Sequence, residues 1–306
     1  MKYLFFDIEG ANNYNYVSKM CTFGYVLASE SFNVLTKVDV IMNPDGPFDK
    51  HILNKKMNAY PLEKYQSAPP FNYFYKSIKK ILEFKEQIIV GWSIENDVRF
   101  IHDACVRYHL EQIRYTFIDL QAIYMKVENL SSPPNLESAC EKYNIPKMTA
   151  HKSDDDAHLT MLLANEICKK LNVTLYNLAL KFKDCCSSYD ECSAHFLTKE
   201  EVEEKVAKRR LVNYINQSDM KKRISHPLID VTDVFCFTSS VIDKYGKELL
   251  SIVKYLKKCG AKCTTNTAKA TFMVVLDDEV KKSSKSDKVK YISLSKLLEK
   301  TNLGIR

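Results

Sequence analysis

The sequence predicts an α/β protein, with a mixed sheet flanked by helices followed by a small parallel α/β domain. Two observations predict this. Near the N-terminus two strand-like runs lie on either side of a turn, and after them helix-type and strand-type apolar patterns alternate. A second alternation of short strands and helices begins near residue 231. We therefore expect domains at 1–180 and 231–306, joined by a helical connector at 181–230.

The elements of the first domain follow in order. Residues 3–6 form a short apolar run that is typical of a buried strand. Turn residues at 29–31 separate two longer strand-like runs, which predicts a hairpin of 20–28 and 32–41. Beyond the hairpin the pattern predicts strands at 87–91 and 116–120, and helices at 71–85, 97–110, 136–143 and from 153 to about 171.

The remaining elements belong to the connector and the second domain. Residues 200–210 read EEVEEKVAKRR, and acids that lead bases favour a helix through its macrodipole. The second domain is predicted to have strands at 234–238, 261–264, 272–276 and 291–294, helices at 247–258 and 281–288, and a terminal helix.

Composition restricts the class of protein. The chain has 306 residues, of which 45% are hydrophobic, and no run of eighteen apolar residues predicts a membrane span. The opening apolar stretch is too short for a signal peptide, so we expect a cytoplasmic protein with no membrane partner. Most of the ten cysteines lie in apolar segments, which predicts reduced thiols in the core.

The excess positive charge is concentrated at the C-terminal end. Residues 1–230 carry 30 basic and 30 acidic side chains, whereas residues 231–306 carry 15 and 8. The whole net charge of +7 therefore lies in the last quarter. A basic appendage on a neutral body fits a nucleic-acid tether, because phosphate contacts dominate such binding. The alternative is an ordinary lysine-rich surface.

Four acids and one histidine stand out in the first half: Asp7, Glu9, Asp97, His151 and Asp156. Asp7 and Glu9 end the first strand, and side chains two apart on a strand point to the same face. Carboxylates gathered at one place repel one another, and a pair of bound divalent cations commonly neutralises this repulsion. Hard oxygen ligands suit Mg²⁺ or Mn²⁺.

This pattern resembles the DEDD superfamily of 3′→5′ exonucleases, in its histidine-containing (DEDDh, DnaQ-like) branch, which includes the proofreading subunit of bacterial replicases. The D-x-E motif is matched by Asp7 and Glu9, the second motif by Asp97, and the H-x-x-x-x-D motif by His151 and Asp156. The resemblance covers about residues 1 to 175 and implies a ribonuclease-H-like fold. The chain departs from many members after the first motif, where Gly10-Ala11-Asn12 replaces a threonine-containing sequence that lies near the terminal nucleotide.

The resemblance implies a two-metal phosphodiesterase. Asp7 would contact both ions, Glu9 and Asp156 would hold the ion beside the attacking water, and Asp97 would reach the other. His151 would accept the proton of the water. The implied function is removal of 5′-mononucleotides from 3′ ends of single-stranded or frayed nucleic acid, with DNA favoured, in replication, repair or turnover. The alternatives are an exoribonuclease and a non-catalytic end-binding or scaffold protein.

The last domain resembles a BRCT domain, on F-x-F-T-x-S at 235–240, Cys259-Gly260-Ala261 and A-T-F-M-V-V at 270–275. The resemblance implies a protein or phosphate partner. Thr238, Ser239 and a lysine of 281–288 (Lys285 or Lys288) occupy positions where some BRCT domains bind phosphate, although Ser239 replaces a common glycine. The alternative is a solvated lysine face.

Several further residues have a functional and a structural interpretation. Asp154 and Asp155 are interpreted as acids in the first turn of a helix. A small zinc site could be formed by Cys185, Cys186, Cys192 and His195, but their spacing lacks C-x₂-C. Tyr14, Tyr16 and the aromatic residues of 71–75 could stack on bases, and core packing is favoured for 71–75.

Overall fold

The computed structural model describes residues 1–54, 59–149, 151–217, 224–280 and 289–301. The chain divides into two compact units, Met1–Phe196 and Leu197–Arg306. The helix expected at 281–288, with Lys285 and Lys288, lies outside the described residues.

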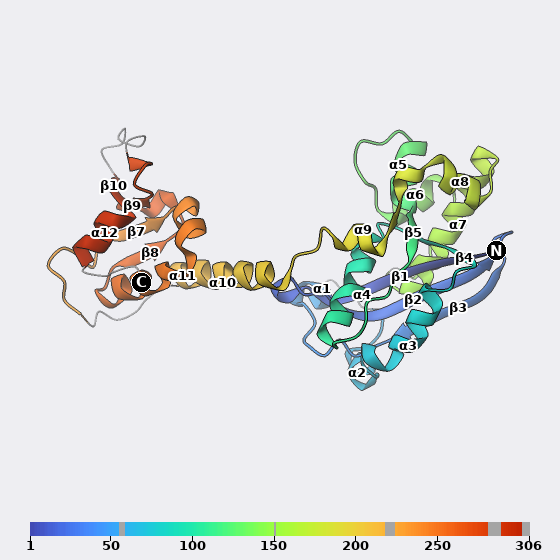
Figure 1. The fold of residues 1–306 in the computed structure, drawn as a ribbon, viewed down its shortest axis with the longest axis horizontal. Coiled ribbons are helices and arrows are strands. Elements are labelled where there is room, and N and C mark those ends of the chain that lie inside the picture. The colour runs from blue at the N-terminus through green and yellow to red at the C-terminus, as the bar shows by residue number, and fades with distance from the viewer. Residues whose placement is uncertain (55–58, 150, 218–223, 281–288, 302–306) are drawn as a thin grey trace. The chain divides into compact units, whose positions relative to one another are not determined.

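A six-stranded mixed sheet forms the centre of the first unit, in the order β3-β2-β1-β4-β5-β6 (Figure 1). The strands are β1 (Lys2–Asn12), β2 (Lys19–Ser29), β3 (Val34–Ile41), β4 (Gln87–Gly91), β5 (Thr116–Asp119) and β6 (Cys186–Ser188). β2 is antiparallel to β1 and to β3, which confirms the predicted hairpin. β4 runs parallel to β1, and β5 parallel to β4. The expected mixed sheet is therefore confirmed.

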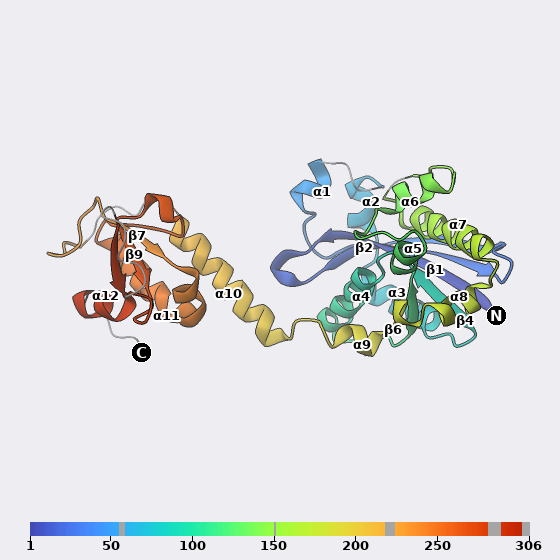
Figure 2. The same ribbon diagram turned by 90° about the horizontal axis from the view of Figure 1, so that it is seen from above.

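Helices cover both faces of this sheet, as Figure 2 shows for α6 and α7 on one side and α3 and α4 on the other. The helices are α1 (Lys50–Asn54), α2 (Leu62–Ser67), α3 (Phe71–Leu82), α4 (Glu95–Arg107), α5 (Leu120–Val127), α6 (Leu136–Lys142), α7 (Ser153–Leu171), α8 (Leu175–Lys181) and α9 (Tyr189–Ser193), with 3-10 turns η1 (Tyr14–Tyr16) and η2 (Lys183–Cys185). Alternate residues of β1 enter the two cores, because strand side chains alternate. Tyr3 and Phe5 pack with α5 to α8, whereas Phe6 and Ile8 pack with α3 and α4.

The predicted helices of the first unit are present, and α1, α2, α5 and α8 are additions that the sequence patterns did not predict. α5 begins because the Asp119 carboxylate accepts hydrogen bonds from the backbone N–H groups of Gln121 (2.9 Å) and Ala122 (3.3 Å). An aspartate at this position satisfies helix donors that would otherwise have no partner. The same carboxylate accepts the N–H of Ser93 (3.2 Å), which fixes the loop before α4.

The first unit extends beyond residue 180. Strand β6 pairs antiparallel with β5 and adds the sixth strand, and α9 packs in the core beneath α4. Residues 181–196 of the expected connector therefore belong to the sheet domain. About seventy residues separate β5 from β6 along the chain, so no local sequence pattern indicates that the two strands pair.

The second unit contains a four-stranded parallel sheet in the order β10-β9-β7-β8. Its elements are α10 (Lys199–Asn216), β7 (Val234–Phe237), α11 (Ser239–Lys258), β8 (Lys262–Thr264), η3 (Thr267–Lys269), β9 (Phe272–Val275), β10 (Lys290–Ser293) and α12 (Leu294–Thr301). The four strands predicted in this part are present, and all pair in parallel.

Helix α10 contains the charged segment in which a helix was expected, and it packs within the second unit. Its last turns bury Leu211 and Ile215 in that core. The buried Lys257 donates from Nζ to the carbonyl oxygens of Tyr214 and Gln217, the latter at 2.8 Å. A cation at these last carbonyl groups ends the helix favourably.

Two predictions from composition can be compared with the structure. All ten cysteines are free, and nine of them are buried, which confirms the prediction of reduced core thiols. Among the described helices, none has the length and apolar character that a membrane span requires.

Candidate active site

Strand β1 carries the first two acids toward α7. Asp7 and Glu9 lie on the same face as Tyr3 and Phe5, at the end of β1 where only β2 still pairs with it. Pairing with β4 stops at Phe5 and Val90. The carboxylates therefore lie at an open edge of the sheet, beyond the carboxyl end of the parallel strand.

Helix α7 brings a third carboxylate to this edge. Its first turn contains Asp156, and the backbone N–H of His151 donates to that carboxylate. Asp7, Glu9 and Asp156 each offer an oxygen such that the three oxygens lie within 4.8 Å of one another. Residues separated by almost 150 positions thus form one group.

Asp97 is the fourth acid of the predicted site. It lies in the first turn of α4 and is only 5% exposed. Its carboxylate accepts the backbone N–H of Ile8, the residue between Asp7 and Glu9. Asp97 is not part of the group of three oxygens, and the hydrogen bond joins it to the backbone of β1 between Asp7 and Glu9.

His151 lies in the loop just before α7. Its φ of 59° is left-handed, which is uncommon for a residue other than glycine and marks a sharp turn. The imidazole is near enough to Glu137 of α6 to contribute, after the ion pair with Lys147, to the lowered pKa of that exposed carboxyl. The backbone N–H of His151 thus contacts the carboxylate group through Asp156, and its imidazole is not one of the group's members.

Burial and mutual repulsion shift the titration of these acids. Desolvation, followed by the charges of Asp97, Glu9 and Asp156, raises the pKa of Asp7 well above its usual range. Desolvation and the charge of Asp156 raise the pKa of Glu9 to about 8. Desolvation and Asp155 raise the pKa of Asp156 to about 7, against the His151 hydrogen bond. Such clustering of perturbed carboxyls is a mark of functional sites.

The donor set fits divalent cations. Three converging carboxylates supply the hard oxygen ligands that Mg²⁺ and Mn²⁺ prefer. A cation also removes the repulsion that raises their pKa values. Asp7, Glu9 and Asp156 could hold one ion. Asp97 lies outside this group of oxygens, and its charge contributes to the raised pKa of Asp7.

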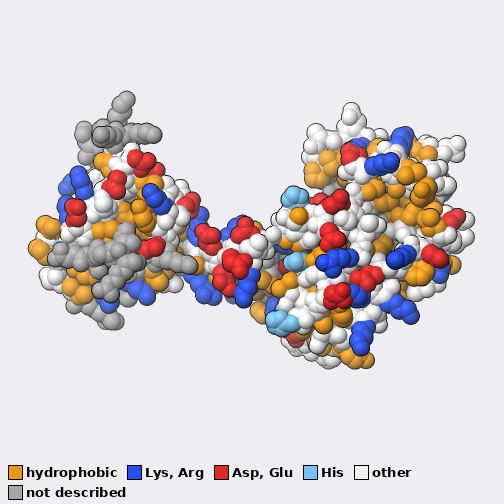
Figure 3. Space-filling model, viewed as in Figure 1, with side chains coloured by type: hydrophobic (Ala, Val, Ile, Leu, Met, Phe, Trp, Pro, Cys, Tyr) orange, Lys and Arg blue, Asp and Glu red, His pale blue; other side chains and the backbone are white. Residues whose placement is uncertain are grey.

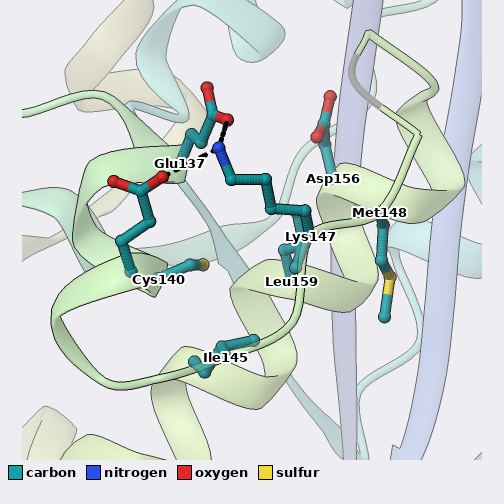
Figure 4. A pocket seen from close by; sticks show the side chains of 8 residues that line it. Glu137, Cys140, Ile145, Lys147, Met148, Asp156 and Leu159 are labelled. Carbon is teal, nitrogen blue, oxygen red and sulfur yellow. Dashed lines mark hydrogen bonds and ion pairs between the residues drawn. The ribbon is translucent and has the colours of Figure 1, made fainter.

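A small pocket opens beside Asp156, between α6, the loop before α7 and α7 itself (Figure 4). Lys147 extends across it and pairs with Glu137 (2.6 Å) and Glu141 (2.8 Å). The lining residues are Glu137, Cys140, Glu141, Ile145, Lys147, Met148, Asp156 and Leu159.

One further acid lies near the group and was missed from the sequence. Asp39 of β3 is close enough for its charge to contribute to the raised pKa values of Asp7 and Glu9. It belongs to no motif, and the only sequence signal is the alternation of Lys37 and Asp39 along an otherwise apolar strand.

The remaining candidate residues are the possible zinc ligands and several aromatic side chains. Among the described residues, Cys185, Cys186, Cys192 and His195 do not form a group with metal-binding separations, so the zinc alternative gains no support. Phe71 is buried in the core, as predicted, whereas Tyr73 is 73% exposed, so the prediction of core packing is wrong for Tyr73. Tyr14 is exposed, and Tyr16 receives a hydrogen bond on its carbonyl from Arg99 (3.4 Å).

The position where a BRCT domain could bind phosphate is next to a carboxylate of the same unit, that of Glu279. Thr238 Oγ1 lies 3.0 Å from Ser240 Oγ, and it also donates to the carbonyl oxygen of Val274. The Glu279 carboxylate accepts hydrogen bonds from Ser240 Oγ (3.0 Å) and from the N–H of Leu276 (3.0 Å). A carboxylate thus already occupies the start of α11, close to Ser239.

The sequence matches the model of a known protein family. The sequence model described as Exonuclease (RNase_T) matches residues 5–164, which contain Asp7, Glu9, Asp97, His151 and Asp156. No curated protein matches the sequence.

Several solved structures are similar to part of this chain. A structure of exonuclease I has a TM-score of 0.51 at 15% identity, over 59% of this chain and 43% of that one. A 3′-exonuclease that recognises a histone mRNA stem-loop has a TM-score of 0.48 at 14% identity, over 55% and 82%. The nuclease domain of 3′hExo, a DEDDh family member bound to rAMP, has a TM-score of 0.47 at 14% identity, over 55% and 91%. At 15% identity, the likeness to exonuclease I concerns the fold alone.

Proposed function

The chain belongs to the exonuclease family, and on that premise we propose that it is a metal-dependent 3′→5′ exonuclease. Its substrate would be a single-stranded or frayed 3′ end, with DNA favoured, and its product a 5′-mononucleotide. The observation that carries the proposal is the convergence of Asp7, Glu9 and Asp156 within 4.8 Å, with Asp97 bonded to the backbone between the first two. A scaffold protein would have no need to bury these repelling groups together.

Each residue has a defined part in the proposed chemistry. Two Mg²⁺ or Mn²⁺ ions, when bound, activate the attacking water and stabilise the leaving 3′ oxygen. Asp7, Glu9 and Asp156 would hold one ion, and Asp97 would help hold the second. His151 accepts the proton of the attacking water, and its backbone N–H keeps the Asp156 carboxylate oriented.

The second unit is proposed to supply remote contacts with nucleic acid. Residues 197–306 carry 23 basic and 14 acidic side chains, whereas residues 1–196 carry 22 and 24. On the face of the first unit in Figure 3, basic and acidic side chains are interspersed. The phosphates of a nucleic acid would therefore be attracted chiefly by the excess basic side chains of the second unit. A protein partner for its BRCT-like fold is the alternative.

The decisive experiment measures digestion of 5′-labelled DNA and RNA strands of one sequence, with Mg²⁺, Mn²⁺ or EDTA. We expect a ladder of products shortened from the 3′ end, only with a divalent ion, and faster on DNA. Faster digestion of RNA would favour the exoribonuclease alternative. Asp7→Ala should abolish digestion, with Asp190→Asn, an exposed aspartate paired with Arg114, as the control. Digestion of DNA and RNA at the wild-type rate by Asp7→Ala would refute the site assignment.

A further inference from the structure

Asp39 lies in the same row of the sheet as Asp7. Asp7 pairs with Gly24, and Gly24 pairs with Asp39, so the three residues are neighbours across β1, β2 and β3. Residues directly opposite on neighbouring strands present their side chains on one face. Because Gly24 has no side chain, the first turn of α7 fills the space above it, between the two aspartates.

The Asp39 carboxylate accepts hydrogen bonds from two hydroxyl groups that belong to separate parts of the fold. Ser153, the fully buried first residue of α7, donates from Oγ to Asp39 Oδ1 at 2.8 Å. Tyr60 donates from its hydroxyl to Asp39 Oδ2 at 2.7 Å. Ser153 Oγ also lies 2.8 Å from Thr22 Oγ1 on β2, so the start of α7 is bonded to both neighbouring strands.

Tyr60 belongs to the segment that covers the end of β1. Its ring lies 6.0 Å from that of Tyr65, which in turn lies 5.1 Å from that of Phe48. These rings pack on Ala11 and Cys21, next to Glu9. Asp39 therefore joins this covering segment to the helix that carries Asp156.

We propose that Asp39 is a positioning residue for the metal site, acting through Ser153 to hold the start of α7 where Asp156 meets Asp7 and Glu9. The inference rests on the proposed function of that site. A carboxylate suits this role because it accepts on both oxygens, whereas an asparagine would present one amide nitrogen to a hydroxyl donor. Lys37, two residues earlier on the same face of β3, pairs with Asp154 (3.5 Å) and holds the same turn.

The test combines activity with Mn²⁺ binding measured by calorimetry and by the Mn²⁺ spin-resonance signal. The variants are Asp39→Ala, Asp39→Asn, Ser153→Ala, Tyr60→Phe and the double variant Asp39→Ala/Ser153→Ala. The control is Asp184→Asn, an exposed aspartate that pairs with Lys126 away from the site. Circular dichroism confirms that each variant is folded, and near-isosteric Asp39→Asn serves if Asp39→Ala does not fold.

We expect Asp39→Ala to weaken Mn²⁺ binding and lower kcat by about 10- to 100-fold, as for other residues that orient metal ligands. The KM for a short oligonucleotide should change less than about threefold, because Asp39 would not touch substrate. Asp39→Asn should fall between Asp39→Ala and wild type. Ser153→Ala should resemble Asp39→Ala, and the double variant should be no worse than the more severe single variant.

The outcomes separate the inference from the proposed function. If wild-type protein neither digests nucleic acid nor binds Mn²⁺, the proposed function fails and the inference fails with it. If wild type does both and the folded Asp39 variants match it, only the inference is overturned. Additive effects of Asp39→Ala and Ser153→Ala would also overturn it, because they would show that Asp39 does not act through Ser153.

Discussion

Gly24 of β2 lies directly against Asp154 of α7: a Cβ atom on Gly24 would come within 2.1 Å of the Asp154 backbone nitrogen. The obstacle is backbone, so no side-chain rotation could relieve it. Gly24 therefore permits an approach of helix and strand that any other residue would prevent. This approach places Asp156, two residues further along α7, beside Asp7.

We predict that Gly24→Ala displaces the start of α7. The variant should lose about 1–3 kcal/mol of unfolding free energy, the usual cost of overpacking. Because Asp156 moves with the helix, Mn²⁺ affinity and kcat should fall as well. Urea denaturation and calorimetry measure these effects. Gly246→Ala in α11 is a matched control, because a Cβ there meets nothing within 4 Å. A Gly24→Ala protein with wild-type stability and metal affinity would contradict the role given to this contact.

The raised carboxyl pKa values predict that stability without metal falls as pH rises. Glu9 changes from an ordinary pKa of 4.5 to about 8 in the fold, so the folded state binds more protons than the unfolded state in this range. This contribution to stability is complete below pH 4.5 and is lost as pH rises through about 8. Scanning calorimetry in EDTA should show a falling Tm over this window, and Mg²⁺ should raise Tm most at the alkaline end.

Glu9→Gln is the control for this pH dependence. Removal of the ionisable group should flatten the fall in Tm across the same window and reduce the stabilisation by Mg²⁺. A wild-type Tm in EDTA that rises between pH 5 and 8, in parallel with Glu9→Gln, would show that the cluster does not titrate as described.

The His151→Ala variant should show whether His151 acts as the general base or as a metal ligand. Since His151 lies outside the group of three carboxylates, Mn²⁺ affinity should stay close to wild type. Turnover should fall by ~10²–10⁴-fold, the usual contribution of general acid–base catalysis. Single-turnover digestion beside Mn²⁺ calorimetry makes the comparison. Loss of Mn²⁺ binding in this variant would mean that the imidazole is itself a ligand.

Removal of residues 197–306 should weaken binding to long single strands and flatten its salt dependence, because fewer counterions are released. The cut follows Phe196, since β6 and α9 complete the first unit and α10 belongs to the second. Turnover on very short oligonucleotides should hardly change. A salt titration of full-length and truncated protein measures the two slopes. Equal slopes on a long strand would leave protein recognition as the better explanation of the second unit.

Most strands and the longer helices could be predicted from the sequence because local patterns determine them, whereas the short helices α1, α2, α5 and α8 could not. Apolar periodicity predicts the strand of Asp7 and the long helix of Asp156, and the period of two places Asp7 and Glu9 on one face. The domain boundary could not be predicted in this way. β6 is only three residues long and joins the sheet through pairing with a strand about seventy residues earlier.

The candidate active site was likewise predictable only in part from the sequence. The sequence by itself determined which acids stand at motif spacing, because residue type and separation are local properties. Only the tertiary structure decided that the Ile8 N–H holds Asp97 and that Asp39 joins the start of α7. These contacts depend on strand register and on the close approach that Gly24 allows. Register and helix packing are set by long-range pairing and by the exclusion of side-chain volume, which no single segment of the chain encodes.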